Sequence, residues 1–162
     1  MKRIVASLAF ALIGMNGLAG EGRDELGLRE FLLDNGFRTY AKTNEICYIS
    51  FGQQPGTNAS ERTCIDPPDE FLKRFADRHF DVRKASQYPQ KRADLTSLDR
   101  NPKTGSPDGI YTVEIVEWLN DTTAKVKYSM YRAPLWAAGY EAVAEKKDGK
   151  WQIKQHGMRL VS

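Results

Sequence analysis

The chain has 162 residues, of which 41% are hydrophobic and 28% are charged, which is enough for one domain with one core. This composition excludes collagen-like, coiled-coil and disordered chains. The formal net charge is +3, and two of the basic residues, Lys2 and Arg3, lie in a segment that we expect to be removed. The net charge of the chain without this segment is close to zero. Such a charge gives no reason to expect binding to nucleic acid or to an anionic membrane.

The first twenty residues have the pattern of a secretory signal peptide. A basic start is followed by a mostly apolar run over residues 4–13 and by the small residues of Gly17-Leu18-Ala19. The apolar run is shorter than the ~20 residues that span a bilayer, so we expect no membrane anchor. We predict a signal peptide over residues 1–20, a single domain over residues 21–162, and a periplasmic or secreted protein.

Cys47 and Cys64 are the only cysteines. An even number of cysteines in an exported protein favours a disulfide, and a bridge here would add about 3 kcal/mol by restricting the unfolded chain. Two separate buried thiols are the alternative. A metal site is not expected, because neither His79 nor His156 has the spacing to a cysteine that a metal site requires.

A first helix is expected over residues 24–35. Leu28, Phe31 and Leu32 follow the spacing of one helix face. We expect the helix to end at Asn35-Gly36, because such a pair readily adopts the left-handed backbone conformation found at helix C-termini. Residues 44–51 are then expected to be extended, because this run is rich in apolar and β-branched side chains.

A second helix is expected to begin at Asp66. Its side chain is suited to cap the helix, Pro67 suits the first helical position, and His79 is expected in the last turn. Residues 83–108 hold few large apolar side chains and an excess of lysine and arginine, so we predict a long basic loop there.

The second half of the chain is expected to form four sequential antiparallel strands, because apolar and polar residues alternate there. Asn120-Asp121 and Asp148-Gly149 predict hairpin turns. The apolar residues shift from odd to even numbers late in the chain, which predicts a β-bulge near His156-Gly157. These elements predict an α+β domain whose curved antiparallel sheet of four to five strands packs against two N-terminal helices.

Two motifs resemble a widespread family of small uncharacterised exported proteins: D-P-P-D-E-F-L-K-R-F at residues 66–75 and D-G-K-W at residues 148–151. The resemblance covers most of residues 44–162. The expected architecture is also similar to the cystatin-like or nuclear-transport-factor-two-like fold, a cone of curved sheet around helices. That likeness implies a fold only, since such folds serve enzymes, binding modules and inhibitors.

Few residues point to catalysis. The chain has no nucleophile elbow, phosphate-binding loop, dinucleotide fingerprint or zinc motif, so no cofactor is expected. His156 is a weak catalytic candidate, because a bulge can turn a side chain into a pocket. Glu114 is another, since beside Tyr128 or Asp77 it would imitate the site of a ketosteroid isomerase. Glu117, three residues further on, is expected on the opposite face of the strand.

The candidate binding residues are Tyr131, Arg132 and Trp136, on either side of the strand-breaking Pro134. Exposed aromatic residues beside an arginine are typical of recognition sites. The leading hypothesis is a non-catalytic module, of an immunity or inhibitor type, that binds a protein or a small ligand. The alternative is a small cone-fold enzyme of the ketosteroid isomerase type, which would require a deep pocket holding a titratable group.

Overall fold

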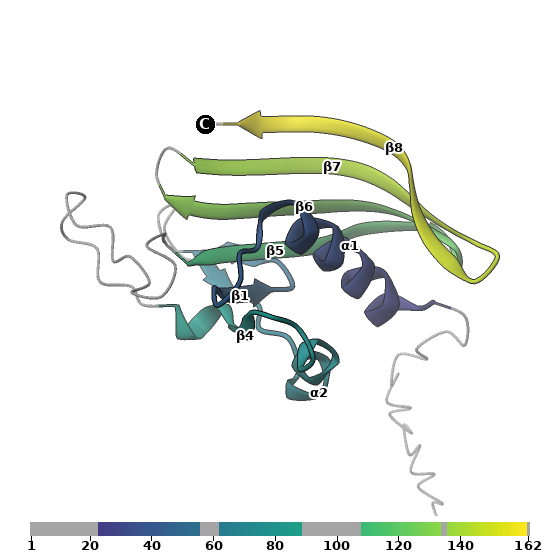
Figure 1. The fold of residues 1–162 in the computed structure, drawn as a ribbon. Coiled ribbons are helices and arrows are strands. Elements are labelled where there is room, and N and C mark those ends of the chain that lie inside the picture. The colour runs from purple at the N-terminus through teal and green to yellow at the C-terminus, as the bar shows by residue number, and fades with distance from the viewer. Residues whose placement is uncertain (1–22, 56–61, 89–107, 134–135, 162) are drawn as a thin grey trace, which may run out of the picture.

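The computed structural model describes residues 23–55, 62–88, 108–133 and 136–161 (Figure 1). The predicted signal peptide lies outside these ranges, and no helix within them is long and apolar enough to cross a membrane. The elements in chain order are α1 (Glu25–Tyr40), β1 (Ile46–Ser50), β2 (Gln53–Pro55), β3 (Arg62–Cys64), α2 (Asp69–Leu72), η1 (Lys73–Phe75), β4 (Asp81–Lys84), η2 (Ala85–Gln87), β5 (Gly109–Asn120), β6 (Thr123–Ala133), β7 (Trp136–Lys147) and β8 (Lys150–Val161).

The main sheet has six strands in the order β4-β1-β5-β6-β7-β8, and β2 and β3 form a separate hairpin. The antiparallel succession of β5 to β8 was predicted and is confirmed, as is the α+β class (Figure 1). The expectation of a purely antiparallel sheet of four to five strands is wrong, because β1 runs parallel to both β4 and β5. β4 has only four residues and no run of large apolar side chains, so its sequence carries little strand signal.

Helix α1 is longer than the sequence predicted. Asp24 caps it by accepting a hydrogen bond from the Gly27 amide at 3.0 Å, and the helix continues through Gly36 to Tyr40. The continuation buries Phe37, whose ring centre lies 4.8 Å from that of Phe80. This packing outweighs the local preference of an Asn-Gly pair to end a helix.

The second expected helix is reduced to one turn, α2, followed by the short 3-10 turn η1. Asp66 does not cap it; its carboxylate instead accepts hydrogen bonds from the amide and the hydroxyl of Ser86, at 3.0 and 2.5 Å. His79 follows the turn and is exposed. The expectation of two N-terminal helices packed on the sheet is therefore not confirmed, since only α1 lies along the sheet for several turns (Figure 1).

The expected basic loop is also shorter than predicted. Residues 83–88 belong to β4 and η2 or directly follow them, because parallel pairing with β1 orders this segment. Residues 89–107 of the predicted loop lie outside the described ranges.

The hairpin turns follow the sequence closely. Asp148 and Gly149 have φ angles of 50° and 75° and join β7 to β8, as the Asp-Gly pair predicts. In β8 the register shifts twice, leaving Lys154 and Arg159 without a partner in β7. The single bulge expected near His156-Gly157 is therefore replaced by two bulges, one on each side of that pair.

The core lies between α1 and one face of the sheet. Arg29 of α1 donates hydrogen bonds to the carbonyls of Val113, at 2.8 Å, and Phe51, at 3.1 Å, and so links the helix to β5 and the end of β1. The apolar side chains of the core come from α1, from the segment around α2 and from strands β1, β5, β6 and β7, and include Leu28, Leu32, Leu33, Phe71, Ile49, Tyr111, Val113, Val126, Met130 and Ala144.

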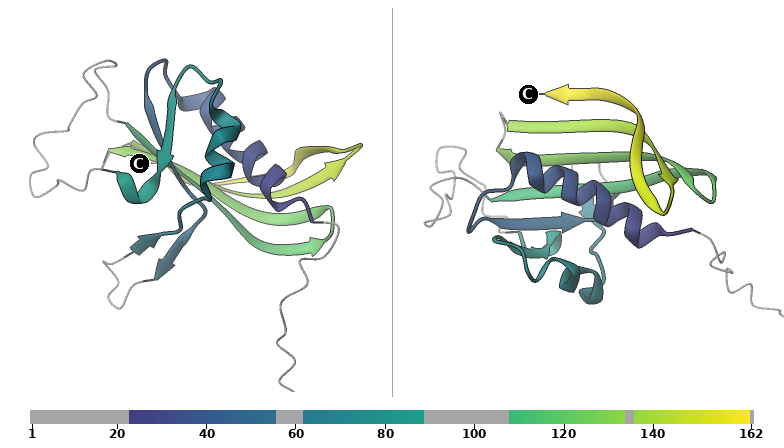
Figure 2. Two further views of the ribbon diagram at one scale, coloured as in Figure 1. Left: turned by 90° about the horizontal axis from the view of Figure 1, so that it is seen from below. Right: turned by 45° about the vertical axis from the view of Figure 1, so that its right-hand side comes forward.

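The expected disulfide is absent, since Cys47 and Cys64 are both free thiols. Cys47 is fully buried in the core beneath α1, and burial raises the pKa of its thiol well above the ordinary range. Cys64 is partly exposed in the β2–β3 hairpin, which lies on the other side of the sheet from α1 (Figure 2). The sheet therefore stands between the two sulfurs.

Candidate functional site

A bulge in β5 decides which face of the sheet carries its carboxylates. Glu114 pairs with Lys127 and Glu117 pairs with Lys125, because Val116 is left out of the register between them. Lys125 and Lys127 are two residues apart in β6, so their side chains and both carboxylates lie on the same face. The expectation of opposite faces for the two glutamates is wrong, since the bulge adds one residue between them.

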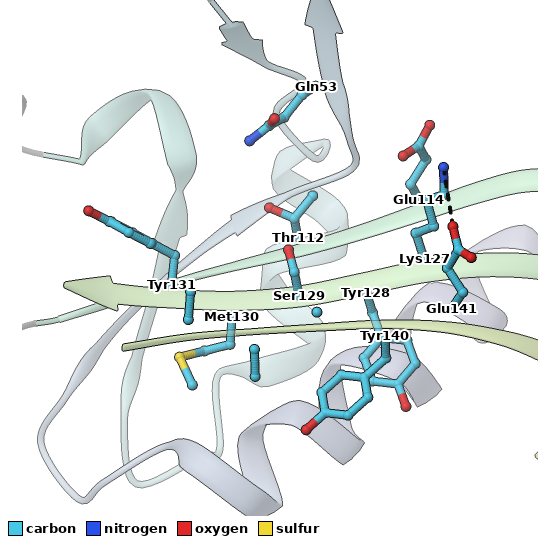
Figure 3. Close-up of a pocket in the computed structure, with 13 residues that line it drawn as sticks. Gln53, Thr112, Glu114, Lys127, Tyr128, Ser129, Met130, Tyr131, Tyr140 and Glu141 are labelled. Carbon is cyan, nitrogen blue, oxygen red and sulfur yellow. Dashed lines mark ion pairs between the residues drawn. The ribbon is translucent and has the colours of Figure 1, made fainter. Parts of the chain in front are cut away.

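The predicted isomerase-like pair is not formed. Glu114 lies on the outer face of the sheet, whereas the Tyr128 side chain points to the face that α1 covers (Figure 3). Asp77 is exposed after η1, and no hydrogen bond or ion pair among the described residues joins it to Glu114. Glu114 therefore has neither of the partners that the enzyme hypothesis assigned to it.

His156 is instead part of a tyrosine cluster on the inner face. Its Nε2 lies 3.0 Å from the hydroxyl of Tyr128, and its ring centre lies 5.0 Å from that of Tyr140. Tyr140 stacks on Tyr128, and its hydroxyl lies 2.6 Å from that of Tyr40 in α1. Tyr40 carried no signal in the sequence, because it joins the cluster only when α1 extends to its fifth turn.

Two tyrosine hydroxyls of this cluster, those of Tyr40 and Tyr128, keep their protons at neutral pH. The hydrogen bond with Tyr140, together with burial, raises the pKa of Tyr40 to about 12. Burial, and secondly Tyr140, raise the pKa of Tyr128. These two groups therefore serve as neutral hydrogen-bonding groups, and neither is a phenolate base near pH 7.

The void beside the inner tyrosines is small. The void beside Tyr40, Tyr128 and Tyr140 measures about 10 Å³. A single buried water needs about 10–15 Å³, so a substrate does not fit there. This void is therefore not the deep pocket that the enzyme hypothesis required.

A larger hollow lies on the outer face of the sheet, and the β2–β3 hairpin forms one of its walls. The chain leaves β1 through Gly52, whose φ of 139° favours glycine. The Phe51 amide donates to the Ile65 carbonyl at 2.7 Å, and the Ile65 amide donates to Gly52 at 3.1 Å. These bonds hold the hairpin on the side of the sheet opposite α1 (Figure 2).

The hollow has a volume of about 530 Å³, within the range of ligand-binding pockets (Figure 3). Ser129, Ala137 and Gly139 leave its floor free of large side chains. Tyr131 lies toward one end of the lining. The other end carries charges: Glu114, and Lys127 with its ammonium 3.6 Å from the carboxylate of Glu141.

The structure separates the three residues predicted to bind a partner. Tyr131 lines the hollow. Arg132 is only 2% exposed and lies 2.6 Å from the carboxylate of Glu45, so the prediction that it is exposed is wrong. Successive residues of a strand point to opposite faces, which sends Arg132 inward. Trp136 begins β7 opposite Ala133, and its side chain lies outside what the structure describes.

Sequence reasoning missed most of the lining of the hollow. Gln53, Thr112, Ser129 and Gly139 belong to no motif, and small or neutral polar residues on a strand are ordinary surface residues. The only usable signal was the alternation of β6, which places Ser129 and Tyr131 on one face. The hairpin wall had no such signal, because its position depends on the backbone at Gly52.

Comparison of the chain with protein-family models, curated proteins and solved structures found no match. The family resemblance of the motifs at residues 66–75 and 148–151 therefore stays a prediction. In the structure the first motif spans α2 and η1, and the second forms the turn between β7 and β8. Both are structural elements away from the hollow, so the function of the chain has to be inferred from the geometry of the site.

Proposed function

We propose that the protein is an exported, non-catalytic module that binds a protein segment or a small ligand in the outer hollow. One observation carries the proposal: the hollow offers about 530 Å³ and several converging polar groups, whereas the void beside the inner tyrosines offers about 10 Å³. Binding sites are concave, largely preformed, and furnished with a few polar groups that orient the ligand. Gln53, Thr112 and Ser129 supply neutral hydrogen-bonding groups, and Tyr131 supplies an aromatic surface.

The same proposal includes the export of the protein and the finer class of its fold. The pattern of residues 1–20 supports export to the periplasm or beyond the cell, and N-terminal sequencing of the exported protein should begin near Gly20 or Glu21. The antiparallel meander with α1 on one face supports a cone of the cystatin-like or nuclear-transport-factor-two-like kind. An immunity or inhibitor protein is one form of such a module.

The proposal is tested with a substitution that fills the hollow from its floor. A Cβ added at Gly139 would meet only the Ser129 Cβ, at 3.9 Å, so Gly139→Trp adds an indole to the hollow without straining the backbone. We expect a library of small polar and aromatic compounds to shift the amide NMR signals of the hollow lining in the wild-type protein. Those shifts should be lost in Gly139→Trp, because the indole occupies the volume that the compounds use.

Val143→Trp is the matched control, since Val143 lies on the same strand and the same face but outside the hollow lining. Its binding pattern should resemble that of the wild type. Compounds that bind Gly139→Trp as well as they bind the wild-type protein would contradict the proposal. So would shifts that gather at the inner tyrosines while the hollow remains unaffected.

A second candidate function is a small enzyme that uses His156. The contact of 3.0 Å between its Nε2 and the Tyr128 hydroxyl favours it, because a tyrosine beside an imidazole can pass a proton to a bound carbonyl. Turnover of a small carbonyl compound by the wild-type protein, lost in His156→Gln, would place this function above binding.

A further inference from the structure

We infer that the ligand of the outer hollow is an extended peptide segment with a basic side chain that pairs with Glu114 and an apolar or aromatic side chain that packs on Tyr131. This inference rests on the proposed binding function and adds the class of ligand. It draws on the ion pairs of the outer face and on the spacing that the strand register imposes.

Three lysines of the outer face pair with glutamates, whereas the side chain of Glu114, at the hollow, does not pair with a lysine in the described part of the chain. The Lys125 ammonium lies 2.7 Å from Glu117, and the Lys154 ammonium lies 3.2 Å from Glu145. Lys127, at the hollow, pairs with Glu141 at 3.6 Å. Within the described part of the chain, the Glu114 carboxylate makes no ion pair or hydrogen bond with any other residue.

The charged end of the hollow therefore favours a cation. Two carboxylates, of Glu114 and Glu141, face one ammonium, of Lys127. An anionic ligand group would be repelled there, whereas an ammonium or guanidinium group would form a charge-assisted hydrogen bond with Glu114. A ligand that displaces water from the carboxylate would strengthen this attraction by lowering the local dielectric.

The hairpin holds the Glu114 side chain at the wall of the hollow. A Cβ placed on Gly52 would lie 3.7 Å from the Cγ of Glu114, so the hairpin backbone passes close to the stem of this side chain. The carboxylate beyond it stays exposed and accessible to a ligand (Figure 3). The wall thus restricts the stem and leaves the charged group available.

The spacing of the lining residues matches that of an extended peptide. Glu114 lies opposite Lys127, Thr112 opposite Ser129 and Ile110 opposite Tyr131. The distance from the Glu114 position to Tyr131 is therefore four strand residues, or about 13 Å. A peptide lying along this direction presents its first and fifth side chains on one face, at the same separation. The hydroxyls of Thr112 and Ser129 lie between these two ends, where a peptide has polar backbone groups.

Three capped pentapeptides test the inference. Each begins with phenylalanine and has serine at the three middle positions, and they end in arginine, glutamine or glutamate. Their dissociation constants are measured from the amide NMR shifts of the hollow lining. We expect the arginine peptide to bind about tenfold more tightly than the glutamine peptide, since one charge-assisted pair is of that order, and the glutamate peptide to bind most weakly.

Two variants test whether Glu114 causes the preference for the arginine peptide. Glu114→Gln should abolish the difference between the arginine and glutamine peptides, because it removes the carboxylate and keeps the shape. Glu117→Gln is the control, since Glu117 lies on the same face and strand but is paired with Lys125 and lies outside the hollow lining. Both side chains are exposed, so neither change threatens the fold.

The outcomes separate this inference from the proposed function. Equal binding of the three peptides, or a preference that Glu114→Gln leaves intact, would overturn the assignment of a basic ligand and leave the hollow as a binding site. If small compounds occupy the hollow and none of the peptides does, the peptide class is wrong. If neither peptides nor compounds affect the hollow, the proposed function itself fails.

Discussion

Tyr131 and Arg132 are neighbours in β6, and the alternation of the strand gives them opposite environments. Tyr131 lines the outer hollow, whereas Arg132 forms a buried ion pair with Glu45 and donates hydrogen bonds to the Tyr40 carbonyl and the Tyr111 hydroxyl. Burial raises the pKa of the Glu45 carboxyl, and the nearby Arg132 acts in the opposite direction. Arg132 therefore connects β6 to the end of α1 and to the start of β1.

Removal of Arg132 alone should be costly for folding. We expect Arg132→Met to lower the free energy of unfolding by about 3–5 kcal/mol, because it leaves the Glu45 carboxylate buried without its cation. The double variant Glu45→Leu with Arg132→Met should regain much of this loss, since it removes both charges. Urea denaturation followed by circular dichroism measures both effects. A single variant as stable as the wild type would show that the pair contributes little.

Asp24 should make stability depend on acidic pH. The hydrogen bond from Lys146, at 2.7 Å, is the main cause that lowers its pKa below the ordinary value, and Trp151 and Gly27 act in the same direction. A lowered pKa in the folded state stabilises the protein above the ordinary pKa of about 4 and loses this effect as the pH falls through the lowered value.

The variant Asp24→Asn isolates the charge, because asparagine also caps helices. At pH 7 we expect it to be less stable by about 0.5–1 kcal/mol, a modest value because the Asp24 side chain is partly exposed. The difference in melting temperature from the wild type should shrink as the pH falls below about 4. Asp77→Asn, at an exposed position, should show no such trend; a difference that stays constant with pH would contradict the assigned ion pair.

Whole elements show how packing overrides local signals. Helix α1 passes through Asn35-Gly36 because Phe37 then packs against Phe75, Phe80 and Tyr111, with ring centres 4.8 to 5.5 Å apart. Burial of one large aromatic side chain is worth about 1.5–3 kcal/mol, more than the ~1 kcal/mol by which glycine weakens a helix.

The variant Gly36→Ala distinguishes a helix that continues from one that stops. In the continuous helix, alanine should raise the free energy of unfolding by about 0.5–1 kcal/mol, because it restricts the unfolded chain. The new Cβ would meet the Tyr111 ring at 3.4 Å, an ordinary contact. A left-handed stop at residue 36 would reverse the sign, since alanine is strained there. Thermal denaturation of the two proteins decides between these cases.

Bulges act at the same scale by changing the face to which residues point. The unpaired Val116 brings Glu114 and Glu117 to one face, and the shifts at Lys154 and Arg159 flank the strand segment that places His156 beside Tyr128. Alternation predicted the strands correctly but not their faces beyond a bulge, because one extra residue reverses every later side chain.

At the scale of the whole molecule, the sheet separates the core on its inner face from the hollow on its outer face. Its inner face packs on α1 and stabilises the fold, and its outer face together with the β2–β3 hairpin forms the hollow (Figure 2). The same division keeps the two thiols apart, since Cys47 belongs to the inner layer and Cys64 to the hairpin.

Replacement of Cys64 should therefore have little effect on stability. We expect Cys64→Ser to change the free energy of unfolding by less than about 1 kcal/mol, whereas loss of a disulfide would typically cost about 2–5 kcal/mol. In the native wild-type protein a thiol reagent should modify Cys64, which is partly exposed, and should reach Cys47 only after unfolding. A protein with no reactive thiol before reduction would contradict the free cysteines.

The sequence by itself determined the α+β class, the four-strand meander and its Asp-Gly turn, because alternation and turn chemistry act between near neighbours. Only the tertiary structure decided the end of α1, the parallel pairing of β1 and β4, the inward direction of Arg132 and the outer hollow. Each of these depends on segments far apart in the chain: Phe37 requires Phe75 and Tyr111, and the hollow requires Gly52 to bring the hairpin over β5 to β7. Such contacts are stabilised by burial and packing, and they form only when the whole chain has folded.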